Sequence, residues 1–447
     1  MSSENKMGVA PIPKLVLSIS LPLVISMMVQ SLYNIVDSIF VARLGEDALT
    51  AVSLAYPAQI LLIAVSVGTG VGVNSLLSRE LGKKNFEGAN KVGLNGLFLA
   101  VVLSLVFTIL GLFIVPSFYR IFTNDAYITG LGISYLRICM LLCSGIFLGT
   151  MGERLLQATG KTSLSMVAQT AGALTNVILD PIMIYGWIGF PKMGVAGAAL
   201  ATVIGQWVAA VLAIILNITK NKEISLSFKG FRPSSSTIKL IYKVGVPAMC
   251  VQALSSLMVI VMNKVLVGFS NTAVAVFGVY YKLHNFIYMP VLGLTQGLIP
   301  IIGYNYGAKN GKRVMAAWKF NTIVACAISA AGMLVFVLLP SQLMSMFNPS
   351  VEMMKMGIPA LRILGLPFIF TAFSVGIGYA CSGMGNGINS MVSALIRQLV
   401  VLVPCVYLLS YLFGLGGIWF AFLVAEVLAA VYAGVSFVHE CRVKISY

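Results

Sequence analysis

The chain has 447 residues, of which 59% are hydrophobic and only 9% are charged, and its mean hydropathy is +0.97. Soluble domains carry about 25% charged residues, so this composition excludes a water-soluble globular protein and indicates a membrane protein. The net charge of +16 could suggest nucleic-acid binding, but the placement of the charges gives it another cause. The seven cysteines lie scattered, mostly in apolar runs, and we expect them to be small core residues.

Apolar runs long enough to cross a bilayer recur along the whole chain. About 20 apolar residues are needed for one helical crossing. Runs of that length fall near residues 15–43, 51–78, 92–115, 129–151, 162–186, 194–217, 240–268, 275–301, 315–339, 357–379, 388–411 and 414–438. The sequence therefore predicts an all-α integral membrane protein with twelve transmembrane helices.

The twelve runs form two similar halves. Pro22 recurs as Pro247, 225 positions later, and Gly160 recurs as Gly385 at the same offset. Six spans per half is an even number, so both halves begin on the same side of the membrane and form parallel repeats. We expect an N-terminal six-helix lobe at 1–217, a cytoplasmic linker at 218–239 and a C-terminal six-helix lobe at 240–447.

The positive charges lie mostly on one side of the predicted spans. Five lysines and arginines fall in the loops on one side, against twenty on the other. Because cytoplasmic loops are enriched in Lys and Arg, both termini are expected to be cytoplasmic. The net charge then follows from topology, and no nucleic-acid partner is needed to explain it. We expect a multi-pass protein of a plasma membrane, in bacteria the inner membrane.

Two carboxylates interrupt the spans of the first half. Ionisable residues inside a membrane are costly and usually functional. Asp37 lies late in the first span and Asp180 late in the fifth, with Asn176 one turn before Asp180 and Thr202 in the sixth span. By helix rise these groups lie roughly 9–12 Å below the outer surface. A supporting polar network is expected from Gln30, Tyr33, Asn34, Gln169 and Gln206.

This constellation suits a coupling ion. Two carboxylates close together in a low dielectric either share a proton or hold a cation between them, so H⁺ and Na⁺ both remain open. If the ion is Na⁺, its ligands would be Asp37, Asn176, Asp180 and Thr202. The alternative is that the two acids only bond helices together. The second half carries Met262 and Cys405 at the positions of Asp37 and Asp180, and a purely structural role would tend to persist in both halves.

Polar residues of the second half are candidates for a substrate cleft. Lys282 and His284 lie in the eighth span and Glu426 in the twelfth, and Met262 is added by its repeat position. Lys282 would repel a cationic substrate or bind an anionic group, or would simply pair with a carbonyl or with Glu426. Glu426 would bind a cationic substrate or bond internally. Arg397 is expected to be structural.

Sequence motifs for enzymatic chemistry are absent. The stretch from Ala158 to Thr162 ends like a phosphate-binding loop, but Leu155 stands where its first glycine is required, so we expect a turn shared by both halves. No catalytic residue, cofactor or ATP site is expected, and uphill transport would need an ion gradient. The alternatives kept open are a flippase for lipid-linked precursors and, in another class, a membrane-embedded enzyme, whose motifs are missing.

These features resemble the multidrug and toxic compound extrusion family over essentially the whole chain. The resemblance is carried by Leu21-Pro22, by Asp37 ahead of Ala42-Arg43-Leu44-Gly45, by the Gly-x-Lys-Asn turns that end at Asn85 and Asn310, and by Asn176-x-x-x-Asp180-Pro181. The pattern is most similar to the DinF-like branch. A second branch of the family places a carboxylate where this chain has Ser255, which favours coupling through the first half alone.

The resemblance implies a function as well as a fold. It implies two bundles around a V-shaped cleft and Na⁺- or H⁺-coupled export of cationic amphipathic drugs. Asp37, Asn176, Asp180 and Thr202 would be the coupling residues. We therefore expect a monomeric antiporter whose partners are cationic small molecules and the lipid bilayer.

Overall fold

The computed structural model describes residues 5–123, 125–347 and 349–444, and every regular element in those ranges is a helix. The chain forms two compact units. One is Ile25–Gly245, here called the N-terminal unit, and the other is Met1–Val24 together with Val246–Tyr447, here called the C-terminal unit. Each unit is described by itself.

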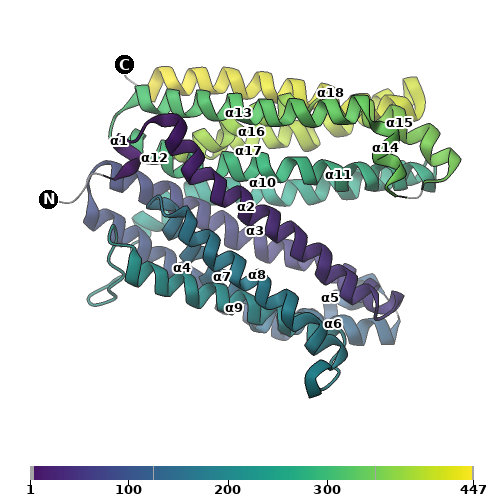
Figure 1. The fold of residues 1–447 in the computed structure, drawn as a ribbon, viewed down its shortest axis with the longest axis horizontal. Coiled ribbons are helices and arrows are strands. Elements are labelled where there is room, and N and C mark those ends of the chain that lie inside the picture. Colours follow the sequence, from purple (N-terminus) through teal and green to yellow (C-terminus); the bar gives the residue numbers. More distant parts are fainter. Residues whose placement is uncertain (1–4, 124, 348, 445–447) are drawn as a thin grey trace. The chain divides into compact units, whose positions relative to one another are not determined.

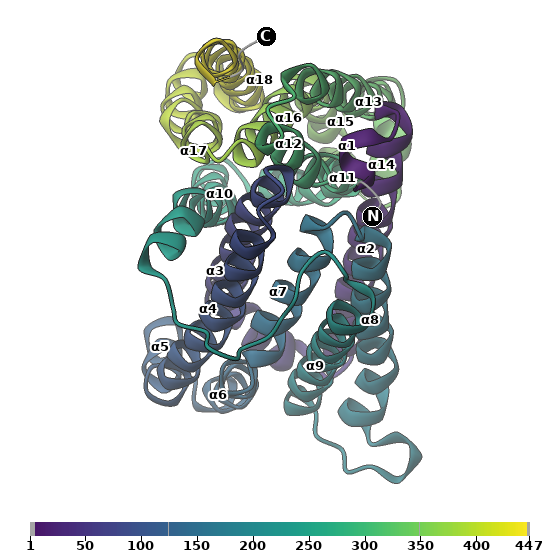
Figure 2. The same ribbon diagram turned by 90° about the vertical axis from the view of Figure 1, so that its left-hand side faces the viewer.

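The N-terminal unit is a bundle of long apolar helices. Its helices are α2 (Ile12–Ala42), α3 (Glu46–Gly82), α4 (Phe86–Phe113), α5 (Val115–Phe122), α6 (Ala126–Leu141), α7 (Ser144–Ala158), α8 (Thr162–Tyr185), the short η1 (Trp187–Gly189) and α9 (Val195–Lys220). The first residues of α2 belong to the other unit. In Figure 1 and Figure 2, α8 runs beside α9, and the two helices pack extensively.

The C-terminal unit is likewise built entirely of helices in its described residues. Its elements are α1 (Lys6–Val9), α10 (Ser235–Val267), α11 (Asn271–Gln296), α12 (Leu298–Gly307), α13 (Gly311–Leu338), α14 (Pro340–Ser345), α15 (Val351–Gly365), α16 (Phe368–Gly383), α17 (Ile388–Leu395), the π-helical turn η2 (Ile396–Val400) and α18 (Leu402–Lys444). The helix α13 packs against α16.

The helices account for the predicted spans. Within the described residues, nine segments are long and apolar enough to cross a membrane, and two bent pairs, α6 with α7 and α15 with α16, raise this to eleven. The segment Ile388–Val443 has 56 residues and would be about 84 Å long, against about 30 Å for one crossing. Gly414, at φ 62° and ψ −148°, breaks its helical geometry. Two crossings in this segment give the twelve that the sequence predicts.

The chain passes between the units inside two long helices. The boundaries fall after Val24, in α2, and after Gly245, in α10. Each lies beside a helix-interior proline, Pro22 or Pro247, which removes a backbone hydrogen bond. These unit bounds differ from the lobes expected at 1–217 and 240–447, because residues 5–24 pack with the second half of the chain.

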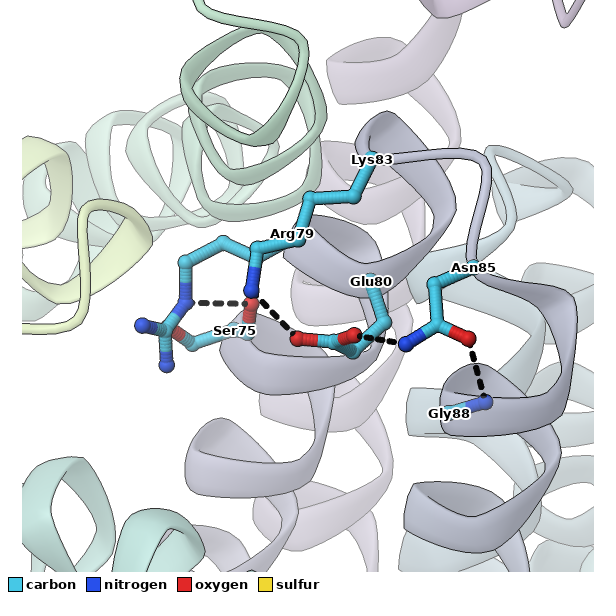
Figure 3. A network of polar contacts seen from close by, with 6 residues as sticks. All are labelled: Ser75, Arg79, Glu80, Lys83, Asn85 and Gly88. Atoms are coloured by element: carbon cyan, nitrogen blue, oxygen red, sulfur yellow. Dashed lines mark hydrogen bonds and ion pairs between the residues drawn. The ribbon is translucent and has the colours of Figure 1, made fainter.

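The repeated Gly-x-Lys-Asn motif forms a helix-ending turn. After α3, Asn85 N–H donates to Glu80 O (2.9 Å) and Lys84 N–H donates to Leu81 O (2.9 Å), with Lys84 left-handed at φ 59°. This is a Schellman turn, which satisfies the last carbonyls of a helix. Figure 3 shows the Asn85 side chain accepting from Gly88 N–H, which begins α4, and donating to Glu80.

The turn recurs at three other helix ends. After α12, Asn310 N–H donates to Asn305 O, with Lys309 at φ 57°. After α7, Lys161 N–H donates to Leu156 O, with Gly160 at φ 80°. Gly385 has φ 86° at the corresponding place after α16. The resemblance to a phosphate-binding loop therefore reflects a helix-ending turn shared by both halves, as expected.

The segment before α2 is bound by the C-terminal unit, and the segment before α10 is bound by the N-terminal unit. Near the N-terminus, Arg313 donates to Ala10 O (2.7 Å) and Met7 O (3.2 Å) within the C-terminal unit. In the polar linker, Ser225 N–H donates to Asn90 Oδ1 (2.7 Å) and Ser234 N–H to Asn95 Oδ1 (2.9 Å), both on α4. The linker is therefore fixed along its length to the N-terminal unit.

Candidate functional site

Small residues bring α8 and α9 into close contact. A Cβ added to Gly172 of α8 would lie 2.6 Å from the carbonyl oxygen of Gly205 in α9, and the reverse distance is also 2.6 Å. Glycine is required where two backbones approach this closely. Because residues one turn apart share a helix face, this contact sets Asn176, one turn after Gly172, against α9.

Asn176 connects α8 with α9 at the predicted site. Its Nδ2 donates to Asp180 Oδ1 and to Thr202 Oγ1, each at 3.3 Å. Asp180 is fully buried and Asn176 is 3% exposed, whereas Thr202 is half-buried. Three of the four predicted coupling residues thus form one continuous polar group.

Asp37 of α2 completes the group. Its carboxyl group lies within hydrogen-bonding reach of the Asp180 carboxyl group. Three buried oxygens have no hydrogen-bond partner, namely Asp37 Oδ1, Asn176 Oδ1 and Asp180 Oδ2. Buried polar atoms left without partners are rare and costly. Pro181 has no N–H and leaves the carbonyl of Val177 without its helical donor. The donor set of carboxylates, amide and hydroxyl oxygens fits a hard cation or a shared proton.

Two contacts hold α2 against α8 on either side of this group. Gln169 Nε2 donates to Gln30 Oε1 (3.2 Å), and Tyr185 OH donates to Phe40 O (2.7 Å). Tyr33 lies close enough to interact electrostatically with both aspartates. The side chains of Asn34 and Gln206 make no hydrogen bond to the four coupling residues within the described ranges. The structure therefore connects Gln30, Tyr33 and Gln169 with the site, but not the other two.

The sequence interpretation missed one branch of the network. Gln59 Nε2 of α3 donates to Tyr135 OH of α6 (3.0 Å), and Cys139 lies beside both side chains. Asp37 interacts electrostatically with Tyr135 and Cys139. Tyr135 and Cys139 are four residues apart and share a helix face, which was the available signal. Cys139, expected to be a core residue, therefore lies beside the site.

The corresponding region of the C-terminal unit is apolar. Met262, at the position of Asp37, is 1% exposed and packs in a cluster with Phe422 and Leu402. Val401 and Cys405 flank the same cluster. The repeat alignment predicted that the second half lacks these polar groups, and the structure has a packed hydrophobic core in their place. Met262 is buried in this core and does not line a surface.

The other cleft candidates do not all lie together. Glu426 Oε1 lies 3.7 Å from Arg397 Nε, so it bonds within its own unit. His284 is stacked on Tyr288, with ring centroids 5.2 Å apart, contacts Phe368 and interacts electrostatically with Arg397. Lys282 is exposed on α11. The structure therefore places His284 near the Glu426 pair, while Lys282 is exposed.

Comparison with known proteins identifies the chain. The family model described as MatE matches residues 22–182 and again residues 247–408, so both matches begin at a repeat-related proline. This chain belongs to the MatE family. The family assignment confirms the resemblance drawn from the sequence, and it makes the chain a membrane transporter and not an enzyme.

Relatives of this MatE protein match it over nearly its whole length. The multidrug export protein MepA of Staphylococcus saprophyticus is 27% identical over 422 residues, which cover 93% of this chain and 91% of the relative. MepA of Staphylococcus haemolyticus is 28% identical over 428 residues, or 94% and 92% of the two chains.

Solved structures agree with the fold. A multidrug resistance MATE family transporter of the MOP superfamily, in an outward-facing conformation, has a TM-score of 0.93 and 27% identity, with 99% of each chain covered. A MOP superfamily transporter from Pyrococcus furiosus, described as having a binding pocket of reverse polarity, has a TM-score of 0.93 and 26% identity, with full coverage of both chains.

Proposed function

We propose that this protein is a cation-coupled antiporter that exports cationic amphipathic drugs or toxic metabolites by alternating access. The coupling ion, Na⁺ or H⁺, would be held by Asp37, Asn176, Asp180 and Thr202. The observation that carries the proposal is the set of three buried oxygens without partners at one place in the N-terminal unit. The MepA relatives are named multidrug export proteins, which favours drug export over flipping of lipid-linked precursors.

The physical basis of coupling is differential affinity. An ion can shift a conformational equilibrium only by as much as its affinity differs between the two states. The site draws its ligands from α2, α8 and α9, so ion binding favours the arrangement in which these three helices are packed together. Drug affinity would be lower in that arrangement, and the drug would leave on the outer side. The ion-loaded transporter then changes to the inward-facing state and releases the ion into the cytoplasm, where the next drug molecule can bind.

The distribution of charged residues supports a membrane location and an orientation for the transporter. The excess of lysine and arginine on one side of the spans supports a plasma-membrane protein with both termini in the cytoplasm. The two units come from one chain, and the proposed ion site lies within one of them, so a monomer suffices for the cycle.

The test is drug movement into proteoliposomes under an imposed ion gradient. Ethidium movement would be followed first with a Na⁺ gradient and then with a pH gradient. We expect one gradient to drive movement in the wild type and none to drive it in Asp37→Asn or Asp180→Asn. Asp47→Asn, an exposed aspartate in the first turn of α3, is the matched control and should transport normally.

Two results would overturn the proposal. Normal gradient-driven efflux by folded Asp37→Asn would remove the coupling role of the N-terminal site. Absence of drug movement under either gradient, together with movement of a labelled polyprenyl-linked substrate, would favour the flippase instead.

A further inference from the structure

A second pair of ionisable side chains lies deep in the C-terminal unit. Arg397 Nε is 3.7 Å from Glu426 Oε1, and the two side chains are 12% and 14% exposed. Glu426 lies about 18 Å along α18 from the break at Gly414, near the middle of a crossing of about 30 Å. Ionisable groups at this depth are costly and are functional candidates by default.

The hydrogen-bonding capacity of the Arg397–Glu426 pair is only partly used. A strong arginine–carboxylate contact is bidentate, with two short parallel hydrogen bonds, whereas here one long contact is present. Glu426 Oε2 is buried without a hydrogen-bond partner. The Thr371 hydroxyl lies beside this carboxyl group but donates to Pro367 O at 3.2 Å. The carboxyl group therefore has a free oxygen that the surrounding protein does not use.

A π-helical turn positions the arginine. Arg397 and Gln398 both lie in η2 (Ile396–Val400). Gln398 Nε2 donates to Ser255 Oγ of α10 (3.1 Å), while Arg397 reaches Glu426 of α18. The turn thus directs two neighbouring side chains to partners on two different helices. Single π-helical turns within α-helices occur frequently at functional sites.

A small cavity lies among the neighbours of the pair, and neither Arg397 nor Glu426 lines it directly. It measures about 10 Å³, and its polar lining comes from His284, Tyr288, Ser329 and Thr371. This volume is close to the minimum that one water molecule needs, and such a water requires two to four polar partners. Tyr288 lies beside Arg397, and Thr371 lies beside Glu426. A water in this cavity would therefore contact neighbours of both charged groups.

We propose that Glu426 is a second proton-binding site of this transporter, located wholly within the C-terminal unit, and that Arg397 is the partner released when the proton binds. The step adds a proton to Glu426 Oε2, forms one O–H bond and neutralises the carboxylate. Arg397 keeps its own proton and its place beside Tyr288, so the unit gains one positive charge. The role of this proton in transport rests on the proposed antiport.

A proton fits this site better than a metal cation. A cation such as Na⁺ needs several oxygen ligands around it, and here the guanidinium group of Arg397 already occupies one side of the carboxylate. The N-terminal site differs because its described neighbours are carboxyl, amide and hydroxyl groups. The two units would therefore bind coupling ions through different chemistry.

The titratable groups facing the pair come from two helices, α11 and α16. Tyr280 of α11 interacts electrostatically with Glu426, and His284 of the same helix with Arg397. Tyr288 faces both members of the pair, and Tyr379 of α16 faces Arg397. Apart from Glu426, these described neighbours include no carboxylate, so a carboxylic-acid signal from this place is assigned to Glu426.

The test is infrared difference spectroscopy of the protein in lipid bilayers between alkaline and acidic pH. Wild-type protein would be labelled with ¹³C at the glutamate carboxyl group, which separates glutamates from Asp37 and Asp180. We expect a carboxylic-acid band that shifts with the label, is lost in Glu426→Gln and is retained in Glu440→Gln. Glu440 lies on the same helix and accepts a hydrogen bond from Asn386, so it controls for loss of a buried glutamate.

Further variants keep the result decisive. The band should persist in Asp37→Asn, which separates this site from the N-terminal one and from the outcome of the flux assay. If Glu426→Gln does not fold, labelled Arg397→Lys replaces it and should move the midpoint pH of the band, while Glu440→Gln leaves the midpoint unchanged. A band that is the same in wild type and folded Glu426→Gln, or a midpoint unmoved in Arg397→Lys, would overturn the proposal.

Discussion

Gly172 and Gly205 face each other so closely that a Cβ on either would lie 2.6 Å from the carbonyl oxygen of the other. This distance is shorter than a Cβ can tolerate, so both positions require glycine. The contact fixes the separation of α8 and α9. Asn176 can reach Thr202 at 3.3 Å because of it.

Gly172→Ala should push α8 and α9 apart. We expect a loss of about 1–3 kcal/mol in unfolding free energy, as for other overpacked sites. The separation of Asn176 from Thr202 should also weaken ion-dependent transport. Thermal unfolding with and without the coupling ion, together with gradient-driven flux, measures both effects.

Gly130→Ala is the matched control for this substitution. Gly130 lies within α6 of the same unit, and a Cβ there meets nothing within 4 Å. Alanine is favoured over glycine inside helices by about 0.5–1 kcal/mol, so this variant should be unchanged or slightly more stable. Equal behaviour of the two variants would argue against the packing role of Gly172.

The core of the site could be predicted because charge inside a membrane is visible in the sequence. Asp37 and Asp180 stand out in apolar runs, and helical spacing places Asn176 beside Asp180. What spacing cannot supply is the contact between helices distant in sequence. The hydrogen bond from Gln59 to Tyr135 joins α3 to α6 across 76 positions, and neither residue is charged.

The same limit explains why the sequence did not predict the contacts within the C-terminal unit. Sequence reasoning expected Arg397 to be structural and left Glu426 either to bind a cationic substrate or to bond internally, but it did not pair the two residues, which the structure places 3.7 Å apart. The π-helical turn that aims Arg397 has no composition signal in Ile396–Val400. The packing of residues 5–24 with the second half is equally hidden, because it depends on tertiary contacts such as that between Arg313 and Ala10.

Thr202→Val should weaken ion binding without unfolding the protein. Valine has nearly the shape of threonine but lacks the hydroxyl group that accepts from Asn176. The loss of one hydrogen bond, about 1 kcal/mol, corresponds to a roughly fivefold higher half-saturating ion concentration. Concentration-dependent ethidium flux measures this. Thr202→Ser keeps the hydroxyl and should behave like the wild type, and a serine variant as impaired as valine would contradict the assignment.

Asn85→Ala and Asn310→Ala test the repeated turn. Asn85 accepts from Gly88 N–H at 3.0 Å to begin α4, and Asn310 accepts from Arg313 N–H at 3.2 Å to begin α13. Each substitution should cost about 1 kcal/mol in stability, as is typical for an N-cap. The two caps share no partner, so the double variant should lose about the sum. Thermal unfolding in detergent measures this, and strongly non-additive losses would show that the caps are not independent.

Arg313→Ala should release the N-terminal segment from the C-terminal unit. Arg313 donates to Ala10 O, Met7 O and Asn305 Oδ1, and Met7 is fully buried. Hydrogen bonds from a charged donor contribute about 1.5–3 kcal/mol, so the variant should be less stable and more readily cleaved near residue 10. Limited proteolysis and thermal unfolding measure the two effects. Lys312→Ala, the exposed neighbour, is the control. If both variants resist cleavage equally, the arginine does not hold the segment, and apolar packing around Met7 must be sufficient by itself.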